Sequence, residues 1–342
     1  MNAPAPPRVH VITGSFGAGK TTAIRWLMRH KPADAMWVVI LNEFTDAGID
    51  ALTVAQAANG SFDVRLVAGG CLCCVGELEF GKQLRDILRN LEPGRLLIEP
   101  SGAGHTADIV DILSIHERQG ALSLDSIVCL VDPIDVARIG ESRPANEWSQ
   151  IQAADALLLS KPDLAGDAER AAFDAIAAAQ YPLKRYLGTC SNGELPAQVL
   201  QHFERDATFS LLGERGEEGF ESKPFDIDGL PGSEVLSRRL GLWAVQWQLP
   251  GELTFARTVL EPQLRWQLDA YGGLLRRMKG VFRTGPGPSW LVQGTAHGLS
   301  AEDSAYRRDS RVELVLNAAP TPEFLEQWRR LLRDAANPRG VL

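Results

Sequence analysis

Residues 14–22 read GSFGAGKTT, and this stretch decides the fold of the first part of the chain. It fits the pattern G-x-x-x-x-G-K-[ST], whose defining positions are Gly14, Gly19, Lys20 and Thr21. An apolar run, Val9–Thr13, leads into it, and an amphipathic stretch, Thr21–His30, leads out. The pattern therefore predicts a strand, a phosphate-binding loop and a helix whose N-terminus points at an anion.

Each residue type in this loop has a physical task. Glycines let backbone N–H groups curl around phosphate oxygens, where a side chain would collide. Lys20 supplies positive charge to the β- and γ-phosphates during binding and catalysis, and the Thr21 hydroxyl can ligate Mg²⁺. We therefore predict a site for a nucleoside triphosphate with Mg²⁺, formed by Gly14, Gly17, Gly19, Lys20, Thr21 and Thr22.

A second motif indicates the base. Residues 157–164 read LLLSKPDL, in which Ser160, Lys161 and Asp163 follow a predicted strand. Proteins that read guanine commonly carry Asn, Thr or Ser followed by Lys-x-Asp at such a place. The Asp163 carboxylate can accept hydrogen bonds from guanine N1–H and N2–H₂, a donor pair that adenine lacks, and the Lys161 stem can cover the purine face. The motif favours GTP, and an ordinary strand-to-helix loop is the alternative.

A carboxylate is also expected near the phosphates. Residues 98–102 read IEPSG, an E-x-x-G at the end of a predicted strand, where many GTPases carry D-x-x-G. Glu99 would lie near Mg²⁺ or the attacking water, and the Gly102 N–H near the γ-phosphate. Asp132, at the end of another predicted strand, is a rival for the metal-side carboxylate, unless it caps a helix. We favour Glu99.

Three of the five cysteines fall within four residues of GGCLCCVGE, at Cys71, Cys73 and Cys74. Three thiolates at this spacing can converge on one soft or borderline ion such as Zn²⁺. A structural role and a redox role are the alternatives, although C-x-C-C is not the spacing of thioredoxin-like centres. Three ligands leave a fourth position open, which suits an ion that is handed on. Cys129 and Cys190 are expected to be ordinary buried residues.

Composition and charge narrow the function. The net charge of −8 argues against a nucleic-acid partner, because nucleic-acid binding relies on basic surface. No apolar run approaches the roughly 18 residues that span a bilayer. Only MNAPAPPR precedes the first predicted strand, so no secretory signal is expected either. These observations predict a cytoplasmic protein without a membrane partner, whose thiols stay reduced.

The order of elements predicts the fold class. Short apolar runs alternate with longer amphipathic stretches up to about residue 200, which favours a mostly parallel P-loop NTPase sheet with helices on both faces. We predict a nucleotide-binding domain over 1–204, a linker or exposed loop over 205–232, and a smaller C-terminal α/β domain over 233–342. In that last domain Trp243, Trp247 and Trp266 are expected in the core.

Taken together, these motifs resemble the CobW branch of the CobW/HypB/UreG family of P-loop GTPases. The matching stretches are GSFGAGKTT (14–22), NEFTDAGID (42–50), GGCLCC (69–74), IEPSG (98–102), SKPDL (160–164), LLRRMKGVF (274–282) and RRDSRVELVL (307–316). The chain departs from the family in two respects. Ser160 stands where Asn is commonest, and the His-rich tract of many relatives is absent.

The resemblance implies a GTPase that loads or delivers a transition metal. Intrinsic turnover is expected to be slow, because the sequence shows no residue that must position the attacking water and no identifiable arginine finger. Zinc is the commonest metal of the family and cobalt, in cobalamin synthesis, the source of its name. Cys71, Cys73 and Cys74 would hold the metal, and Glu43 is a candidate further ligand or switch residue. The implied partner is a client metalloprotein of unknown identity, and a homo-oligomer stays open. The rival readings are a regulatory GTP-dependent switch with a structural zinc and a metal-independent P-loop ATPase or kinase.

Overall fold

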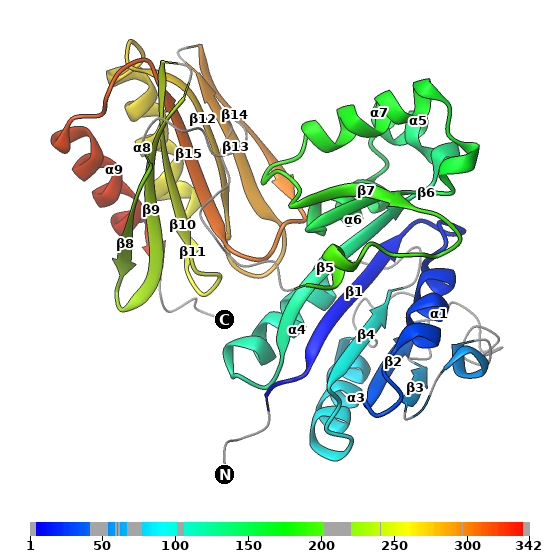
Figure 1. The fold of residues 1–342 in the computed structure, drawn as a ribbon. Helices are drawn as coiled ribbons and strands as arrows, with labels where there is room; N and C mark the ends of the chain where they lie inside the picture. The colour runs from blue at the N-terminus through cyan, green and yellow to red at the C-terminus, as the bar shows by residue number, and fades with distance from the viewer. Residues whose placement is uncertain are drawn as a thin grey trace. The chain divides into compact units, whose positions relative to one another are not determined.

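The computed structural model describes residues 5–41, 54–58, 60, 62–66, 77–100, 106–201, 220–239, 241–295 and 297–337. The chain divides into two compact units, Met1–Glu204 and Arg205–Leu342. Each unit has its own seven-stranded sheet (Figure 1), and among the described residues the first unit has two hydrophobic cores and the second has one.

The sheet of the first unit is entirely parallel, as the alternation of strands and helices predicted. Its strand order is β3-β2-β4-β1-β5-β6-β7. The strands are β1 (Arg8–Gly14), β2 (Trp37–Leu41), β3 (Phe62–Leu66), β4 (Arg95–Glu99), β5 (Ser123–Val131), β6 (Ala156–Ser160) and β7 (Tyr186–Cys190). Because all seven run the same way, their carboxyl ends meet at one edge, with β1 in the middle.

Helices lie on both faces of this sheet. They are α1 (Lys20–His30), α3 (Glu77–Asn90), α4 (Thr106–Arg118), α5 (Pro133–Ser142), α6 (Ala145–Ala153) and α7 (Asp167–Ala178), with short 3₁₀ turns η2 (Pro162–Leu164) and η3 (Ala197–Leu200). Helix α1 matches the predicted stretch Thr21–His30 within one residue, whereas α5 and β7 were not predicted. The first turn of α5 proves important for the site.

Alternate side chains of the central strands β1 and β4 pack in two separate hydrophobic cores, one on each face of the sheet. Val9 and Val11 of β1 pack in the core shared with α3, α4, α6 and α7, whereas Ile12 packs in the core shared with α1. Leu96 and Ile98 of β4 alternate with Leu97 in the same way. A strand that is buried on both faces needs apolar residues at nearly every position, which is why these strands read as continuous apolar runs.

The second unit carries an antiparallel sheet, with strand order β14-β13-β12-β15-β10-β9-β8. Its elements are β8 (Phe220–Ile227), β9 (Leu230–Arg239), β10 (Leu242–Leu249), β11 (Thr254–Phe255), α8 (Arg257–Ala270), β12 (Leu275–Phe282), β13 (Ser289–Thr295), β14 (Gly298–Ser304), β15 (Ser310–Leu316), α9 (Pro322–Ala335) and β16 (Ala336–Asn337). The core contains residues of α8 and α9 together with inward side chains of the sheet, among them Trp247 and Trp328.

Two predictions for this part of the chain are wrong. The predicted linker over 205–232 includes all of β8 and the start of β9, which pair as an antiparallel hairpin. Trp266 was expected in the core, but 55% of it is exposed on α8. Trp247 is buried as expected, and Trp243 is partly buried against the core. Among the described residues, no helix is both long and apolar enough to cross a membrane.

Candidate functional site

The loop between β1 and α1 has the backbone of a phosphate-binding loop. Gly14, Gly17 and Gly19 have φ angles of 140°, 77° and 94°, a region that side-chain-bearing residues rarely adopt. Gly14 also lies tightly against β5, because an added Cβ would stand 2.3 Å from the Leu130 carbonyl oxygen. Gly19 is the N-cap of α1 and supplies no side-chain cap, so the first turn of the helix presents its N–H groups to the loop.

The Lys20 side chain folds back over the loop. Its Nζ donates hydrogen bonds to the carbonyl oxygens of Gly14, at 3.1 Å, and Ser15, at 3.0 Å. Lys20 is buried, with 7% of it exposed. The ammonium group is thus held in the concave side of the loop, where an incoming phosphate would meet it.

Thr21 and Glu99 meet as the sheet order requires. Strand β4 lies directly beside β1, so Glu99 at its carboxyl end lies next to the loop that follows β1. Thr21 Oγ1 donates a 2.9 Å hydrogen bond to Glu99 Oε1. A second contact, the 2.7 Å hydrogen bond between the hydroxyls of Thr13 and Thr106, ties the end of β1 to the start of α4.

The donor set at this point fits a hard divalent cation. A hydroxyl and a carboxylate are the oxygen ligands that Mg²⁺ uses at nucleotide sites, where phosphates and waters complete its shell. The geometry favours Glu99 over its rival, because Asp132 Oδ1 accepts a 3.1 Å hydrogen bond from the Ile134 N–H and caps α5. Asp132 therefore serves as the helix cap that the sequence left as its alternative role.

The predicted base motif follows β6, two strands from β1. Lys161 has a left-handed backbone, with φ of 46°, and its Nζ donates a 2.6 Å hydrogen bond to Asp132 Oδ2. Ser160 is buried and its hydroxyl donates to the Val131 carbonyl at 3.3 Å. Asp163 lies exposed in η2, so its carboxylate is accessible to a ligand.

Sequence reasoning missed a turn that lies beside this motif. Ser191 to Glu194 form a tight turn after β7, in which the Glu194 N–H donates to the Ser191 carbonyl at 2.9 Å. Asn192 and Gly193 have φ angles of 50° and 82°. An added Cβ at Gly193 would stand 2.5 Å from the Thr22 carbonyl oxygen, so the turn packs directly on the first turn of α1. The Asn-Gly pair is a turn signal that could have revealed it.

The first turn of α5 was missed as well. Ser15 Oγ in the phosphate loop donates a 3.0 Å hydrogen bond to Asp135 Oδ2, and Asp132 receives the hydrogen bond from Lys161. Arg138 in turn donates 2.8 Å hydrogen bonds to Asp135 and Glu147. One short stretch of chain therefore holds both the phosphate loop and the base motif.

Five of the predicted site residues lie outside the described residues: Glu43, Cys71, Cys73, Cys74 and Gly102. Within the part of the chain that the structure describes, no group of three or more His, Cys, Asp or Glu side chains is placed to hold a metal. Cys129 and Cys190 are buried free thiols, as expected. Burial raises the pKa of Cys129 to about 12 and that of Cys190 to about 11, so both remain protonated near neutral pH.

A parallel sheet, a phosphate loop before α1 and a carboxylate beside Thr21 together define a P-loop nucleotide-binding protein. Residues 8–186 match the family described as CobW/HypB/UreG, nucleotide-binding domain, and the chain belongs to this family. This confirms the resemblance drawn from the motifs.

Similar proteins are known in Escherichia coli strain K12. The zinc chaperone YeiR is 36% identical over 156 residues, 46% of this chain and 47% of that protein. The zinc chaperone YjiA is 33% identical over 176 residues, 48% of this chain and 52% of that protein. A crystal structure of Zn(II)-bound YjiA GTPase from E. coli superposes with a TM-score of 0.48 at 20% identity, over 97% of this chain and 99% of that one. The chain spans about half the length of these curated relatives.

Proposed function

We propose that this protein is a GTP-hydrolysing metallochaperone. It binds a transition metal through Cys71, Cys73 and Cys74 and passes it to a client metalloprotein. We propose zinc as this metal, with cobalt as the alternative. Transfer depends on the bound nucleotide. Family membership and relatives named zinc chaperones support the class of activity, and the three cysteines support the cargo.

One observation carries the proposal: the strand before the cysteines ends at the same edge of the sheet as the phosphate loop. β3 ends at Leu66 and lies three strands from β1. At about 4.8 Å per strand this separation is roughly 14 Å. The five residues from Leu66 to Cys71 can span about 17 Å when extended. The chain from β3 to the cysteines is therefore long enough to bring them to the phosphate loop, which supports the proposal.

The described residues give the nucleotide half of the mechanism. Lys20 would exchange its two carbonyl partners for phosphate oxygens, and the Asp163 carboxylate would accept from the guanine edge. Thr21 and Glu99 would hold Mg²⁺, which would neutralise negative charge at the phosphates. Because the Thr21 hydroxyl donates its hydrogen to Glu99, its oxygen lone pairs stay available for a cation. Gly102 and Glu43 would complete the γ-phosphate and metal contacts, and intrinsic turnover is expected to be slow until a partner completes the site.

Zinc affinity in different nucleotide states tests the proposal. Chelator competition would be run on reduced, metal-stripped protein with Mg²⁺ and a non-hydrolysable GTP analogue, and again with GDP. We expect affinity to differ by about tenfold or more, equivalent to about 1.4 kcal/mol of coupling. The difference should vanish in the Cys71/Cys73/Cys74→Ser variant. The matched control replaces Cys129 and Cys190 by alanine, because both thiols are buried within the first unit.

The result separates the proposal from its rivals. Zinc bound equally tightly in both nucleotide states would indicate a structural ion and a regulatory switch. Preference for ATP over GTP, with no zinc bound, would indicate a metal-independent P-loop enzyme. Repeating the competition with Co²⁺ decides between the two cargo metals, and transfer to an apo-protein is then measured with the metal that binds.

A further inference from the structure

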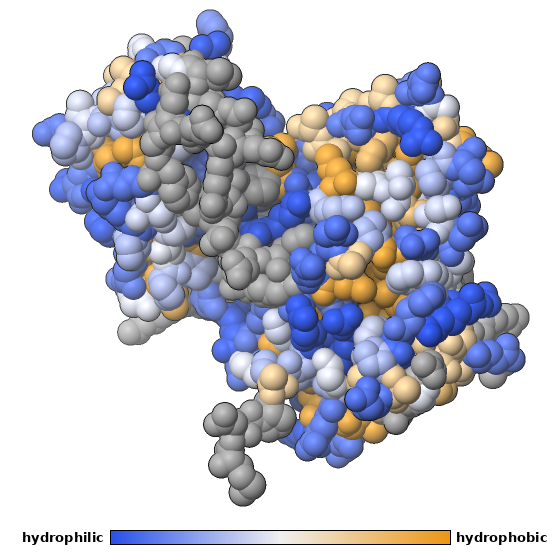
Figure 2. Space-filling model, in the orientation of Figure 1, coloured by the Kyte–Doolittle hydropathy of each residue, from blue (hydrophilic) through white to orange (hydrophobic). Residues whose placement is uncertain are grey.

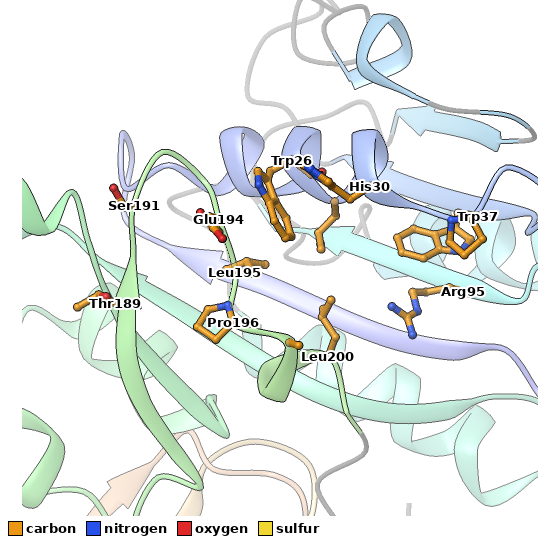
Figure 3. Close-up of a pocket in the computed structure, with 13 residues that line it drawn as sticks. Trp26, His30, Trp37, Arg95, Thr189, Ser191, Glu194, Leu195, Pro196 and Leu200 are labelled. Atoms are coloured by element: carbon orange, nitrogen blue, oxygen red, sulfur yellow. The ribbon is translucent and has the colours of Figure 1, made fainter.

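A pocket of about 670 Å³ opens beside α1, on the face of the sheet opposite α3, α4, α6 and α7. Figure 3 shows it between α1 on one side and the segment that leads from β7 into η3 on the other. We call it the α1 pocket, and its lining includes Trp26, Trp37, Arg95, Glu194, Leu195 and Leu200. In the space-filling view, apolar residues gather on this face between α1 and η3 (Figure 2). Its volume is typical of a small-molecule site.

Aromatic rings form much of the pocket wall. Trp26 is held in place by His30, whose ring lies 4.3 Å away between centroids and whose Nδ1 lies 2.7 Å from the Trp26 carbonyl oxygen. Trp37, at the start of β2, is buried beneath Arg95, whose guanidinium lies 4.7 Å from the ring centroid. Rings fixed in this way can receive a planar ligand at little cost in conformational entropy.

Arg95 gives the pocket a positive end. Its guanidinium extends towards the middle of the pocket in Figure 3. Within the described residues it makes no hydrogen bond and no ion pair, whereas its neighbour Arg8 pairs with Asp125. A guanidinium carries five N–H donors in a fork that matches a carboxylate. An uncharged ligand that covered Arg95 would remove water from those donors and leave them without a partner.

A negative side chain lies at the other end. Glu194, in the turn after β7, is exposed at the rim, with Trp26 lying between it and Arg95 in Figure 3. Apolar side chains such as Leu195 and Leu200 lie on the side opposite α1. The pocket thus has the Glu194 carboxylate at one end, aromatic and apolar side chains in the middle, and the Arg95 guanidinium at the other end.

We infer that the α1 pocket is a second ligand site, for a planar aromatic acid that also carries a hydrogen-bond donor at its far end. The acid lies on Arg95, the ring lies against Trp26, and the donor faces Glu194. The site is separate from the phosphate loop, although the Ser191–Glu194 turn borders both, since Gly193 packs on Thr22. The inference goes beyond the proposed function and does not depend on GTP, zinc or a client.

Three rigid probes test the charge order of the pocket by calorimetry on the full-length, nucleotide-free protein. They are 6-aminonaphthalene-2-carboxylate, its 2-carboxamide, which lacks the negative charge, and naphthalene-2-carboxylate, which lacks the amine. We expect the full probe to bind about tenfold more tightly than the carboxamide, as a charge-assisted hydrogen bond implies. Loss of the amine should weaken binding less, because Glu194 is exposed.

Arg95→Met is the decisive variant, since its side chain still covers Trp37 but carries no charge. It should bind the acid and the carboxamide equally, whereas Arg95→Lys should keep part of the preference. Arg29→Met is the matched control, because Arg29 is exposed on α1 and does not line the pocket. Trp26→Leu should weaken the binding of all three probes, and this result would show that they bind in the pocket.

The inference is overturned if the acid binds no better than the carboxamide, or if its preference survives in Arg95→Met with an unchanged melting temperature. Failure of all three probes to bind at millimolar concentration would overturn it too. Binding of GDP is measured in parallel on the same samples. A protein that binds the acid but no guanine nucleotide would contradict the proposed function and leave this inference standing.

Discussion

Thr21 donates a 2.9 Å hydrogen bond to Glu99, although 78 positions separate them in sequence. The contact exists because β4 lies beside β1, so the end of one strand meets the loop that follows the other. Several consequences of this arrangement and its neighbours can be measured.

Glu99→Gln keeps the shape of the side chain and its hydrogen bond with Thr21 but removes the negative charge. Mg²⁺-dependent GTP turnover should fall about tenfold or more, because the cation loses a charged ligand. Binding of GDP without Mg²⁺ should change little. Steady-state phosphate release and fluorescent GDP titration measure the two effects, and equal losses in both would show that Glu99 acts on folding instead.

The variant Asp163→Asn should change the preferred base from guanine to xanthine. The asparagine amide carries an N–H donor in place of one acceptor oxygen of the carboxylate. This donor mismatches the guanine N2–H₂ group but matches the oxygen that xanthine carries at the same ring position. GTP affinity should fall about 10- to 100-fold and XTP affinity should rise. Competition between GTP and XTP measures the change in preference. A variant that prefers GTP as strongly as the parent would show that Asp163 does not contact the base.

Asp132 has two tasks that one pair of variants separates. Asparagine is as good an N-cap as aspartate, so Asp132→Asn should leave stability nearly unchanged while losing the charge that faces Lys161. Asp132→Ala should also lose the cap, at a cost of about 1 kcal/mol. If Lys161 needs this partner to cover the base, both variants weaken GTP binding alike and only the alanine variant melts earlier.

Gly14→Ala should destabilise the first unit by about 1–3 kcal/mol, because the new Cβ would collide with the Leu130 carbonyl oxygen. Gly120→Ala is the control. Gly120 also has a positive φ, of 69°, but nothing lies within 4 Å of an added Cβ. Urea denaturation measures both variants. The larger loss expected for Gly14→Ala combines the collision with a φ of 140° that alanine adopts less readily than 69°, and similar losses in the two variants would argue against the collision.

His10 predicts a pH dependence of stability. It is fully buried, with Nδ1 2.9 Å from the Ser126 hydroxyl, and burial lowers its pKa to about 3. Below its unfolded pKa of about 6.5 the unfolded chain therefore binds more protons than the folded one. The free energy of unfolding should fall as the pH drops from 6.5 towards 3, by at most about 1.4 kcal/mol per pH unit.

His10→Gln should flatten this part of the stability curve. Carboxylates add their own acid dependence, so the quantity to measure is the difference between variant and parent by urea denaturation from pH 7 to pH 4.5. His30→Gln, at an exposed position on α1, is the control. A parent and a His10 variant with parallel curves would contradict the assignment.

The arrangement of the candidate nucleotide-site residues could be largely predicted from sequence because its elements are local. The phosphate loop, the run that ends at Glu99 and the S-K-x-D motif each lie within a few residues, and the parallel sheet brings their ends to one edge. The contact between Lys161 and Asp132 could not be predicted, since it depends on which strands are neighbours. The binding and catalytic roles of the candidate nucleotide-site residues remain predictions, as do those of Glu43, Gly102 and the three clustered cysteines.

The missed hairpin shows a different limit. β8 and β9 read as a linker because Phe220–Ile227 is an edge strand with Glu, Ser, Lys and Asp among its residues, so its apolar periodicity is weak. Its turn signal was present, however. Asp228 and Gly229 have φ angles of 52° and 80°, as a two-residue hairpin turn requires, and Asp-Gly is among the strongest sequence signs of such a turn.

The first turn of α5 limits how this protein can change over evolutionary time. Asp135 receives the hydroxyl of Ser15 from the phosphate loop, while Asp132, three residues earlier, receives the ammonium of Lys161. A mutation that shifted this turn would therefore disturb the contacts of both Lys161 and Ser15, which belong to the two parts of the proposed nucleotide site. Over evolutionary time, substitutions that move this turn should therefore be paired, one in 132–135 and one in 15–19.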